Sequence, residues 1–216
     1  ICHCLVGSEM CIRDSVLYNN AGLIYRDFEL TEEGYESMIA VNYFGSFRLA
    51  LMLLENLHRR SGRIVQVTSF SMYLARTFNL SGLHSKDSFS PSSRYNFTNL
   101  LRSMFAIELE NKLKKTSISV SAAHPGVTKS RQSRPYEVKK IKKSFYTYFS
   151  TNINTGIAPI IRAIEDENIT ADLVYAPKLI GIYGEPALMR HNKLVYNQEL
   201  RDKLWSYTAN ELNLDI

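Results

Sequence analysis

The feature that most constrains the fold of this chain is an alternation between short apolar runs and longer segments with helical periodicity. The run at 64–67 is typical of a buried strand, whereas apolar residues recur at helical spacing in the segment before it. Strands that alternate with helices pair in parallel, because each helix returns the chain across a face of the sheet. The sequence therefore predicts an α/β fold, a doubly wound parallel sheet with helices on both faces. The predicted strands are 16–18, 64–67, 117–123 and 179–183, and the predicted helices are 31–58, 95–113, 157–163 and 197–212.

The first of these helices has a clear predicted start. Thr31 is a favourable N-cap, and Glu32 and Glu33 fall in the first turn, where the helix dipole favours anions. We expect the helix to begin directly after Thr31.

Length and composition fit one globular domain. The chain has 216 residues, 45% of them hydrophobic, with no internal repeat and no stretch that resembles a linker. It has no apolar run of the ~20 residues that a membrane-spanning helix needs. The formal net charge of +5 is that of a mildly basic enzyme and does not call for a nucleic-acid partner.

The start of the chain is set apart by its cysteines. Cys2, Cys4 and Cys11 are the only three in the chain, and this spacing lacks the second half of a metal site. Residues 4–15 instead resemble the in-frame translation of a transposase adapter used for sequencing libraries, whose end ATG TGT ATA AGA GAC AG encodes Met10 to Asp14. We therefore expect 1–15 to be non-native and 16–216 to be the C-terminal part of a single domain, with no disulfide and no metal site.

Several short motifs follow one another in an order that is informative as a set. They are Asn19-Asn20-Ala21-Gly22, Asn42, Val67-Thr68-Ser69, Tyr95 and His124-Pro125-Gly126. Each is weak alone, but together, with compatible spacing, they resemble the short-chain dehydrogenase/reductase family over nearly all of 16–216. The gap from Ser69 to Tyr95 and the ending Lys203-Leu204-Trp205-Ser206 look most like its retinol dehydrogenase and WW-domain oxidoreductase branch. The resemblance implies a Rossmann-type sheet that lacks the first βαβ units of the fold.

The resemblance implies hydride exchange between a nicotinamide and an alcohol or carbonyl carbon. In the family, a serine orients the substrate oxygen, a tyrosine passes the proton, and an asparagine in a helix holds a water of the proton relay. Ser69, Tyr95 and Asn42 stand at these positions. Each also has an ordinary interpretation, Ser69 as a polar strand end and the other two as polar residues of amphipathic helices.

Asn99 departs from the family pattern. A tyrosine phenol, with an ordinary pKa of about 10, is a poor base at neutral pH. The family offsets this with a lysine four residues after the tyrosine on the same helix face. Here that position is Asn99, whose amide can hydrogen-bond a ribose hydroxyl but carries no charge, and a second Tyr-x-x-x-Lys match, Tyr136 to Lys140, lies on the wrong element. We expect impaired catalysis and an unaffected fold.

The resemblance also implies a cofactor, NADP or NAD. The residues at the family's cofactor-lining positions are Asn20, Ala21, Gly22, Val67, Thr68, Pro125, Gly126, Val127 and Thr128. The glycine-rich turn that places a pyrophosphate on a helix N-terminus is absent from the sequence, and the residue that selects NAD or NADP is expected upstream with it. The missing strands would pair beside 16–18, so we expect this strand to be a sheet edge.

The implied substrate is a lipophilic alcohol or carbonyl of retinoid, steroid or fatty-alcohol type. Two other interpretations stay open. One is a non-catalytic homologue that binds a cofactor or a partner, suggested by Asn99. The other is a broken gene product with no activity of its own. A homodimer also stays open.

A basic stretch at 129–143 is followed by a cluster of aromatic residues at 145–149. Pro135 is well placed near a helix start, so 134–149 is predicted to be a basic amphipathic helix. The corresponding segment of the family covers the substrate pocket. Three roles compete: a lid that also makes peripheral membrane contact with anionic lipid, a solvated helix face, and a nucleic-acid patch, which the charge balance disfavours. The expected location is the cytoplasm or the cytoplasmic face of an internal membrane.

Overall fold

The computed structural model describes residues 16–58, 62–128, 152–168, 170–179 and 181–214. The adapter-like segment 1–15 and the predicted basic helix 134–149 lie outside these residues.

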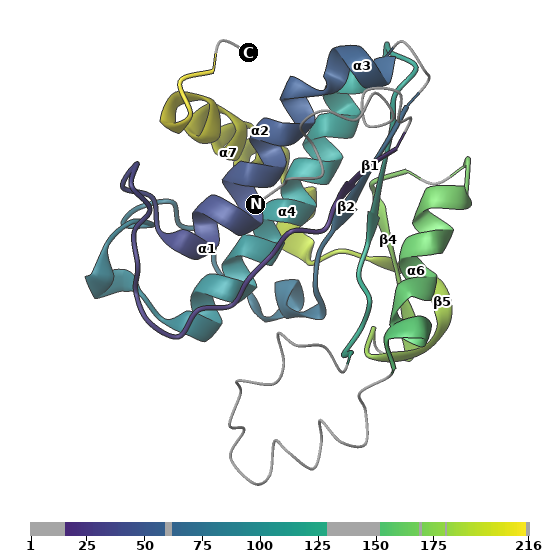
Figure 1. The fold of residues 1–216 in the computed structure, drawn as a ribbon, viewed down its shortest axis with the longest axis horizontal. Helices are drawn as coiled ribbons and strands as arrows, with labels where there is room; N and C mark the ends of the chain where they lie inside the picture. The colour runs from purple at the N-terminus through teal and green to yellow at the C-terminus, as the bar shows by residue number, and fades with distance from the viewer. Residues whose placement is uncertain (1–15, 59–61, 129–151, 169, 180, 215–216) are drawn as a thin grey trace, which may run out of the picture.

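The described residues form a five-stranded sheet in the order β1-β2-β3-β4-β5 (Figure 1). Its parallel strands are β1 (Val16–Asn19), β2 (Arg63–Val67), β3 (Ser119–Ala123) and β4 (Leu173–Leu179). The last strand, β5 (Tyr183–Arg190), runs antiparallel to β4. β1 is the outer strand on the other side of the sheet, where the sequence predicted an edge.

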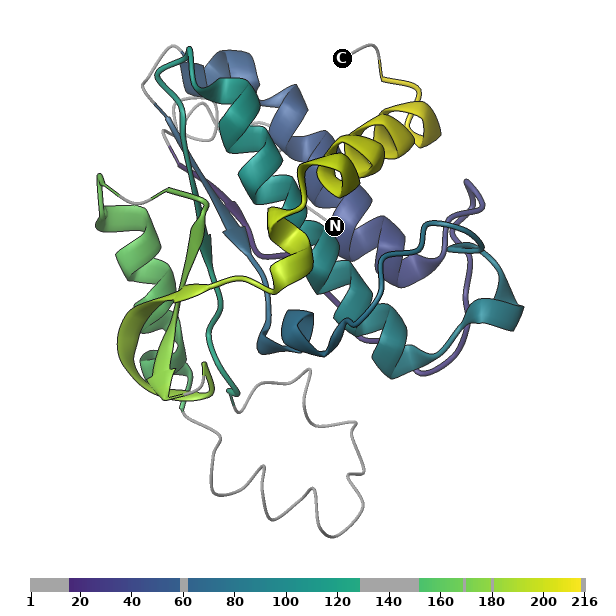
Figure 2. The same ribbon diagram turned by 180° about the vertical axis from the view of Figure 1, so that it is seen from behind.

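Helices cover both faces of this sheet (Figures 1 and 2). α4 (Pro91–Leu113) and α7 (Gln198–Glu211) lie on one face, and α6 (Ile153–Glu165) lies on the other. Side chains of β2 point alternately to the two sides, so that Ile64 joins the larger core and Val65 packs in the smaller one with Ile160 and Ala163 of α6. This arrangement confirms the predicted α/β fold.

Aromatic rings join the helices of the larger core. The ring centroid of Phe47 lies 4.9 Å from that of Phe105 on α4 and 4.9 Å from that of Trp205 on α7. Phe47 belongs to a helix in four segments: α1 (Ser37–Ile39), the π-helical turn η2 (Ala40–Phe44), α2 (Gly45–Met52) and α3 (Leu54–His58).

The predicted start of this helix at Thr31 is wrong. The N-cap is Glu36, whose carboxylate accepts hydrogen bonds from the backbone N of Met38 at 3.0 Å and of Ile39 at 3.1 Å. Gly34 has a φ of +85°, which turns the preceding residues away from a helix. The acidic pair after Thr31 therefore belongs to a turn.

The strand predicted at 179–183 is also wrong, because this apolar stretch contains the turn between β4 and β5. Gly181 has a φ of +68° in that turn. Pro177 stands opposite Pro186 in the hairpin, and proline disfavours strand interiors. Both prolines are tolerated because β4 pairs with β3 only as far as Tyr175, and β5 is an edge strand.

β4 was not predicted from the sequence, and the remaining differences concern boundaries. α4 begins at Pro91, four residues before the predicted start, because proline suits the first turn of a helix. The segment between β2 and α4 contains the short 3₁₀ turns η3 (Phe70–Leu74) and η4 (Lys86–Ser88), and η6 (Lys193–Tyr196) precedes α7. Within the described ranges, no helix is long and apolar enough to cross a membrane.

Candidate active site

The predicted site residues gather at the carboxyl ends of three neighbouring strands. Asn20 follows β1, Thr68 follows β2 and His124 follows β3. The carboxyl ends of parallel strands lie at the same end of the sheet, and open α/β folds bind their ligands there.

The helical turn from Tyr95 to Asn99 is fastened to the end of β2. Tyr95 is half-buried and Asn99 is buried. The amide Nδ2 of Asn99 donates to the backbone O of Tyr95 at 2.9 Å, so it is engaged within its own helix. The backbone O of Asn99 accepts from Thr68 Oγ1 at 3.0 Å. Val67 and Thr68 are both buried, and their contact with a cofactor stays a prediction.

Asn42 joins the loop after β1 to the same turn of α4. It lies in the π-helical turn and is 0% exposed. Its Oδ1 accepts from Leu23 N at 2.7 Å, and its Nδ2 donates to Leu23 O at 2.9 Å and to Thr98 Oγ1 at 3.2 Å. Because Thr98 lies between Tyr95 and Asn99, the Asn42 side chain is held at the turn that carries both.

Ser69 is positioned by a turn that a distant part of the chain supports. It is half-buried and caps η3, with Oγ accepting from Ser71 N at 3.3 Å. Asn192, which follows β5, donates from Nδ2 to the backbone O of Met72 at 2.8 Å and of Ala75 at 2.9 Å. The structure thus brings the segments of Ser69, Asn42 and Tyr95 together, while the chemical role of each stays a prediction.

The predicted cofactor residues that follow β1 lie at the surface. Asn20, Ala21 and Gly22 are exposed. A Cβ at Gly22 would lie 3.2 Å from Arg102 Nη1 and 3.5 Å from Asn42 Oδ1, so a side chain here would press on both. Glycine therefore lets this loop pack closely on Arg102 and Asn42 while its backbone stays exposed.

The turn after β3, Pro125 to Thr128, requires its glycine. Gly126 has a φ of +74°, and a Cβ there would overlap Ile182 O and lie 2.7 Å from Pro177 Cγ. His124, directly before the turn, accepts from Gly126 N at 3.0 Å through Nδ1. Burial lowers the pKa of His124 to about 3, so its ring is neutral at pH 7.

Arg102 is a buried charged residue that the motifs do not include. It is 4% exposed, and its Nη2 donates to the backbone O of Ala21 at 2.5 Å and of Asn19 at 3.5 Å. The sequence does carry a signal for it. Arg102 follows Tyr95 by seven residues and Asn99 by three, which places all of them on one face of α4.

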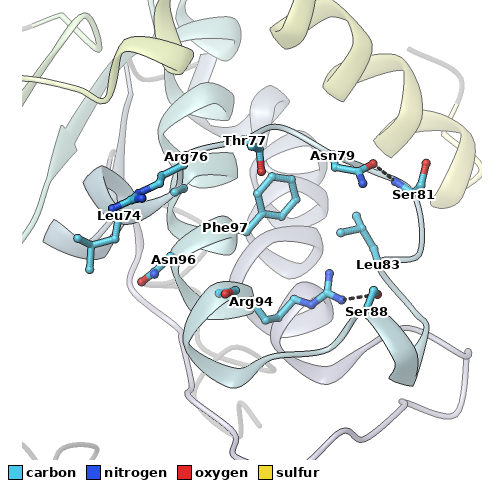
Figure 3. A pocket seen from close by; sticks show the side chains of 12 residues that line it. Leu74, Arg76, Thr77, Asn79, Ser81, Leu83, Ser88, Arg94, Asn96 and Phe97 are labelled. Atoms are coloured by element: carbon cyan, nitrogen blue, oxygen red, sulfur yellow. Dashed lines mark hydrogen bonds between the residues drawn. The ribbon is translucent and has the colours of Figure 1, made fainter.

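A separate hollow of about 460 Å³ lies between the loop after η3 and the first turns of α4 (Figure 3). Arg94 extends along it toward Ser88, with Nη2 3.5 Å from Ser88 Oγ, and Phe97 lines its wall. Tyr95 does not line this hollow, which therefore lies on another face of α4. No three His, Cys, Asp or Glu side chains in the described part of the chain are placed to hold a metal ion.

Comparison with known proteins identifies the family. A family model described as short chain dehydrogenase matches residues 14–140. Retinol dehydrogenase 14 of Homo sapiens is 30% identical over 172 residues, which cover 80% of this chain and 49% of the relative. Polyprenol dehydrogenase of Mus musculus is 29% identical over 206 residues, which cover 88% of this chain and 58% of the relative. The chain therefore spans about half the length of these curated relatives.

A solved structure shows the same fold. The crystal structure of an uncharacterised protein from Mycobacterium paratuberculosis superposes with a TM-score of 0.72 at 23% identity, over 93% of this chain and 67% of the other. The match of the family model carries the assignment, and the curated relatives confirm the branch that the motifs indicate. This chain belongs to the short-chain dehydrogenase family and to its retinol dehydrogenase-like branch.

Proposed function

We propose that the complete protein is an NAD(P)-dependent oxidoreductase that interconverts a lipophilic alcohol and its carbonyl, of retinoid, steroid or fatty-alcohol type. The observation that carries this proposal is the convergence of three segments on one turn of α4. Asn42 bonds Thr98 within that turn, and Thr68, the neighbour of Ser69, bonds the backbone O of Asn99. The relatives named as retinol and polyprenol dehydrogenases support a lipophilic substrate.

The residues at the strand ends fit a nicotinamide cofactor. The backbone of Asn20, Ala21 and Gly22 is exposed at the end of β1, where a cofactor would approach it. We assign the nicotinamide end to the turn from Pro125 to Thr128. The bound nicotinamide would give or accept the hydride.

The side chains of this chain would handle the substrate oxygen and its proton. In the reducing direction, Ser69 Oγ donates a hydrogen bond to the carbonyl oxygen, and Tyr95 gives that oxygen its phenolic proton. Asn42 holds a water on the path by which the phenolate recovers a proton. In the oxidising direction, the Tyr95 phenolate accepts the proton of the alcohol.

The test is turnover of retinol, a polyprenol and a short alcohol by the complete protein with each nicotinamide. Tyr95→Phe and Ser69→Ala should each lower turnover at least about 100-fold, the usual size of a proton-transfer contribution. Tyr175→Phe is the matched control, because the Tyr175 hydroxyl bonds Asp166 at 2.7 Å, away from the site. Full activity of Tyr95→Phe would refute the proposal.

Asn99 supports a second candidate, a non-catalytic homologue that binds a cofactor or a partner. Its amide is engaged with the backbone O of Tyr95 and brings no charge, so position 99 alone predicts impaired catalysis. Micromolar binding of a nicotinamide by the complete protein, without turnover of any alcohol or carbonyl, would favour this candidate.

We further propose that residues 16–216 are the C-terminal part of one dehydrogenase domain. The 216 residues contain no glycine-rich turn for a pyrophosphate. Titration calorimetry of this chain with NAD and with NADP should therefore show no binding tighter than about millimolar. A micromolar dissociation constant would contradict this assignment.

The membrane contact through 134–149, at the cytoplasmic face of an internal membrane, is also a proposal. Co-sedimentation with vesicles should rise with their anionic lipid content and fall with salt, because exposed charges are screened.

A homodimer is tested by the mass of the complete protein in solution.

A further inference from the structure

Arg94 and Arg201 are both buried and paired with a carboxylate, but their guanidinium groups are bonded to different extents. Arg94 Nε lies 3.5 Å from Glu36 Oε2, and Arg201 Nε lies 3.2 Å from Glu108 Oε2. Arg201 also donates hydrogen bonds from both of its Nη atoms to neighbouring groups of the protein. Within the described ranges, the Arg94 guanidinium makes a single hydrogen bond, from Nη2 to Ser88 Oγ at 3.5 Å. Several of the five N–H donors of Arg94 are therefore left for a ligand.

The Arg94 side chain lines the hollow of about 460 Å³ between the loop after η3 and the first turns of α4 (Figure 3). It is only 5% exposed, so a buried cation stands at the wall of this hollow. The other polar side chains that line it are Arg76, four hydroxyls and two amides, and no aspartate or glutamate is among them. Positive charge and hydrogen-bond donors without a carboxylate in the wall suit an anionic ligand.

The ring of Phe97 adds an apolar wall to this polar hollow. In Figure 3 it stands between the guanidinium groups of Arg76 and Arg94, which lie toward opposite ends of the hollow. The ring centroid of Phe78 lies 6.0 Å from that of Phe97, so the two rings pack against each other. A bare inorganic ion at Arg94 would leave the ring of Phe97 without a contact. An anionic group joined to a planar or apolar body would contact both.

The hollow is separate from the predicted catalytic and cofactor positions. Tyr95 does not line it, and neither does any of the predicted cofactor residues. The pair with Glu36 explains why Arg94 is buried, because Glu36 caps α1, but it does not explain the unbonded Nη donors beside an open hollow. We propose that the hollow binds a small organic anion, whose carboxylate or phosphate is held by Arg94 and whose planar or apolar body lies on Phe97. This site does not depend on the proposed function.

The test is binding of phenyl phosphate to this chain, with inorganic phosphate and phenol as probes that each lack one half of it. Phenyl phosphate should bind with a dissociation constant of about one millimolar or tighter, and each half at least about tenfold more weakly. The backbone amide NMR signals of Asn96 and Phe97 should shift, whereas those of Gly22 and Thr128 should not. No binding, or shifts confined to Gly22 and Thr128, would refute the site.

Two variants test the role of the charges. Glu36→Gln removes the carboxylate that competes with the anion for Arg94, so phenyl phosphate should bind at least about threefold more tightly. Glu36→Gln combined with Arg94→Gln removes both charges of the pair and leaves neither buried alone, and it should abolish binding. Unchanged binding by this double variant would overturn the inference.

The matched control is Glu108→Gln combined with Arg201→Gln, which removes the other buried pair and should leave binding unchanged. If the double variant at positions 36 and 94 does not fold, Phe97→Leu decides, because it keeps the charged pair. Phe97→Leu should bind phenyl phosphate and inorganic phosphate with nearly equal affinity. A preference for phenyl phosphate that persists in Phe97→Leu would show that the probe does not lie on this ring, and the proposed site would be wrong.

Discussion

At the scale of single residues, the glycine of the turn after β3 should be irreplaceable. Gly126→Ala combines a left-handed backbone with overlap against Ile182 O. We expect it to lower the free energy of unfolding by about 3 kcal/mol or more. Gly34→Ala is the control, because its φ is +85° but nothing lies within 4 Å of the added Cβ. It should cost only about 1–2 kcal/mol of backbone strain. Urea denaturation measures both, and equal losses would show that the overlap relaxes freely.

Motifs predict residues whose type and neighbours in the sequence are informative. Ser69 directly follows a recognisable strand, and Tyr95 stands at the start of a predicted helix, so the family resemblance could single out both residues from the sequence. Arg102 could not, because its importance comes from what surrounds it in space. An arginine on a helix is usually solvated, and only the structure shows that this one is 4% exposed and, among the described residues, has no ion pair.

At the scale of elements, the hairpin β4–β5 should support the site through Asn192. Asn192→Asp keeps the oxygen that accepts from Leu194 N but removes the donor to Met72 O and Ala75 O. It also sets a carboxylate beside two carbonyl oxygens. We expect stability to fall by about 3 kcal/mol.

The matched control is Asn197→Asp. Asn197 acts only as the N-cap of α7, accepting from Leu200 N at 3.1 Å, and aspartate caps as well as asparagine. This variant should be nearly neutral when both are compared by thermal unfolding. A loss as large as that of Asn192→Asp would mean that the negative charge, rather than the missing donor, is what destabilises.

The hairpin itself also marks the limit of prediction at this scale. Three of the parallel strands, β1, β2 and β3, could be predicted because their runs are largely apolar, as in 64–67. The fourth, β4, was missed, because Pro177 and Lys178 interrupt its apolar pattern. β5 alternates between partly buried and exposed residues and contains Pro186, so it does not resemble a strand of a parallel sheet. A strand was predicted at 179–183 because this run is apolar, but Gly181 makes it a turn.

At the scale of the whole molecule, two buried histidines should make the fold acid-sensitive. Burial lowers the pKa of His124 to about 3 and that of His191 to about 4. The unfolded chain binds protons at these residues near pH 6.5 and the folded chain does not. The contribution of the two histidines to the free energy of unfolding is therefore fully present above pH 6.5. It is lost as the pH drops below that value, by about 2 kcal/mol per histidine at pH 5.

The measurement is the free energy of unfolding from pH 7 to pH 4.5 in the unaltered chain and in His191→Gln. The difference between the two isolates the histidine, which matters because burial raises the pKa of Glu36 and shifts stability in the opposite direction. The slope against pH should fall by about one proton in the variant. Parallel curves would show that His191 is protonated in the folded state.

The π-helical turn at Ala40–Phe44 has a consequence for how this helix tolerates changes in length. Gly45 N donates to Ala40 O, five residues back, so the turn holds one residue more than an α-helical turn does. Deleting a residue from an ordinary helix rotates everything beyond it by about 100°. Deleting Val41 would instead remove the surplus residue and leave Phe47 and Ala50 facing the core. Such a shortened chain should fold with little loss of stability, yet Asn42 would lose its register with Leu23 and Thr98. A single-codon deletion here would therefore keep the fold and lose the arrangement of the site.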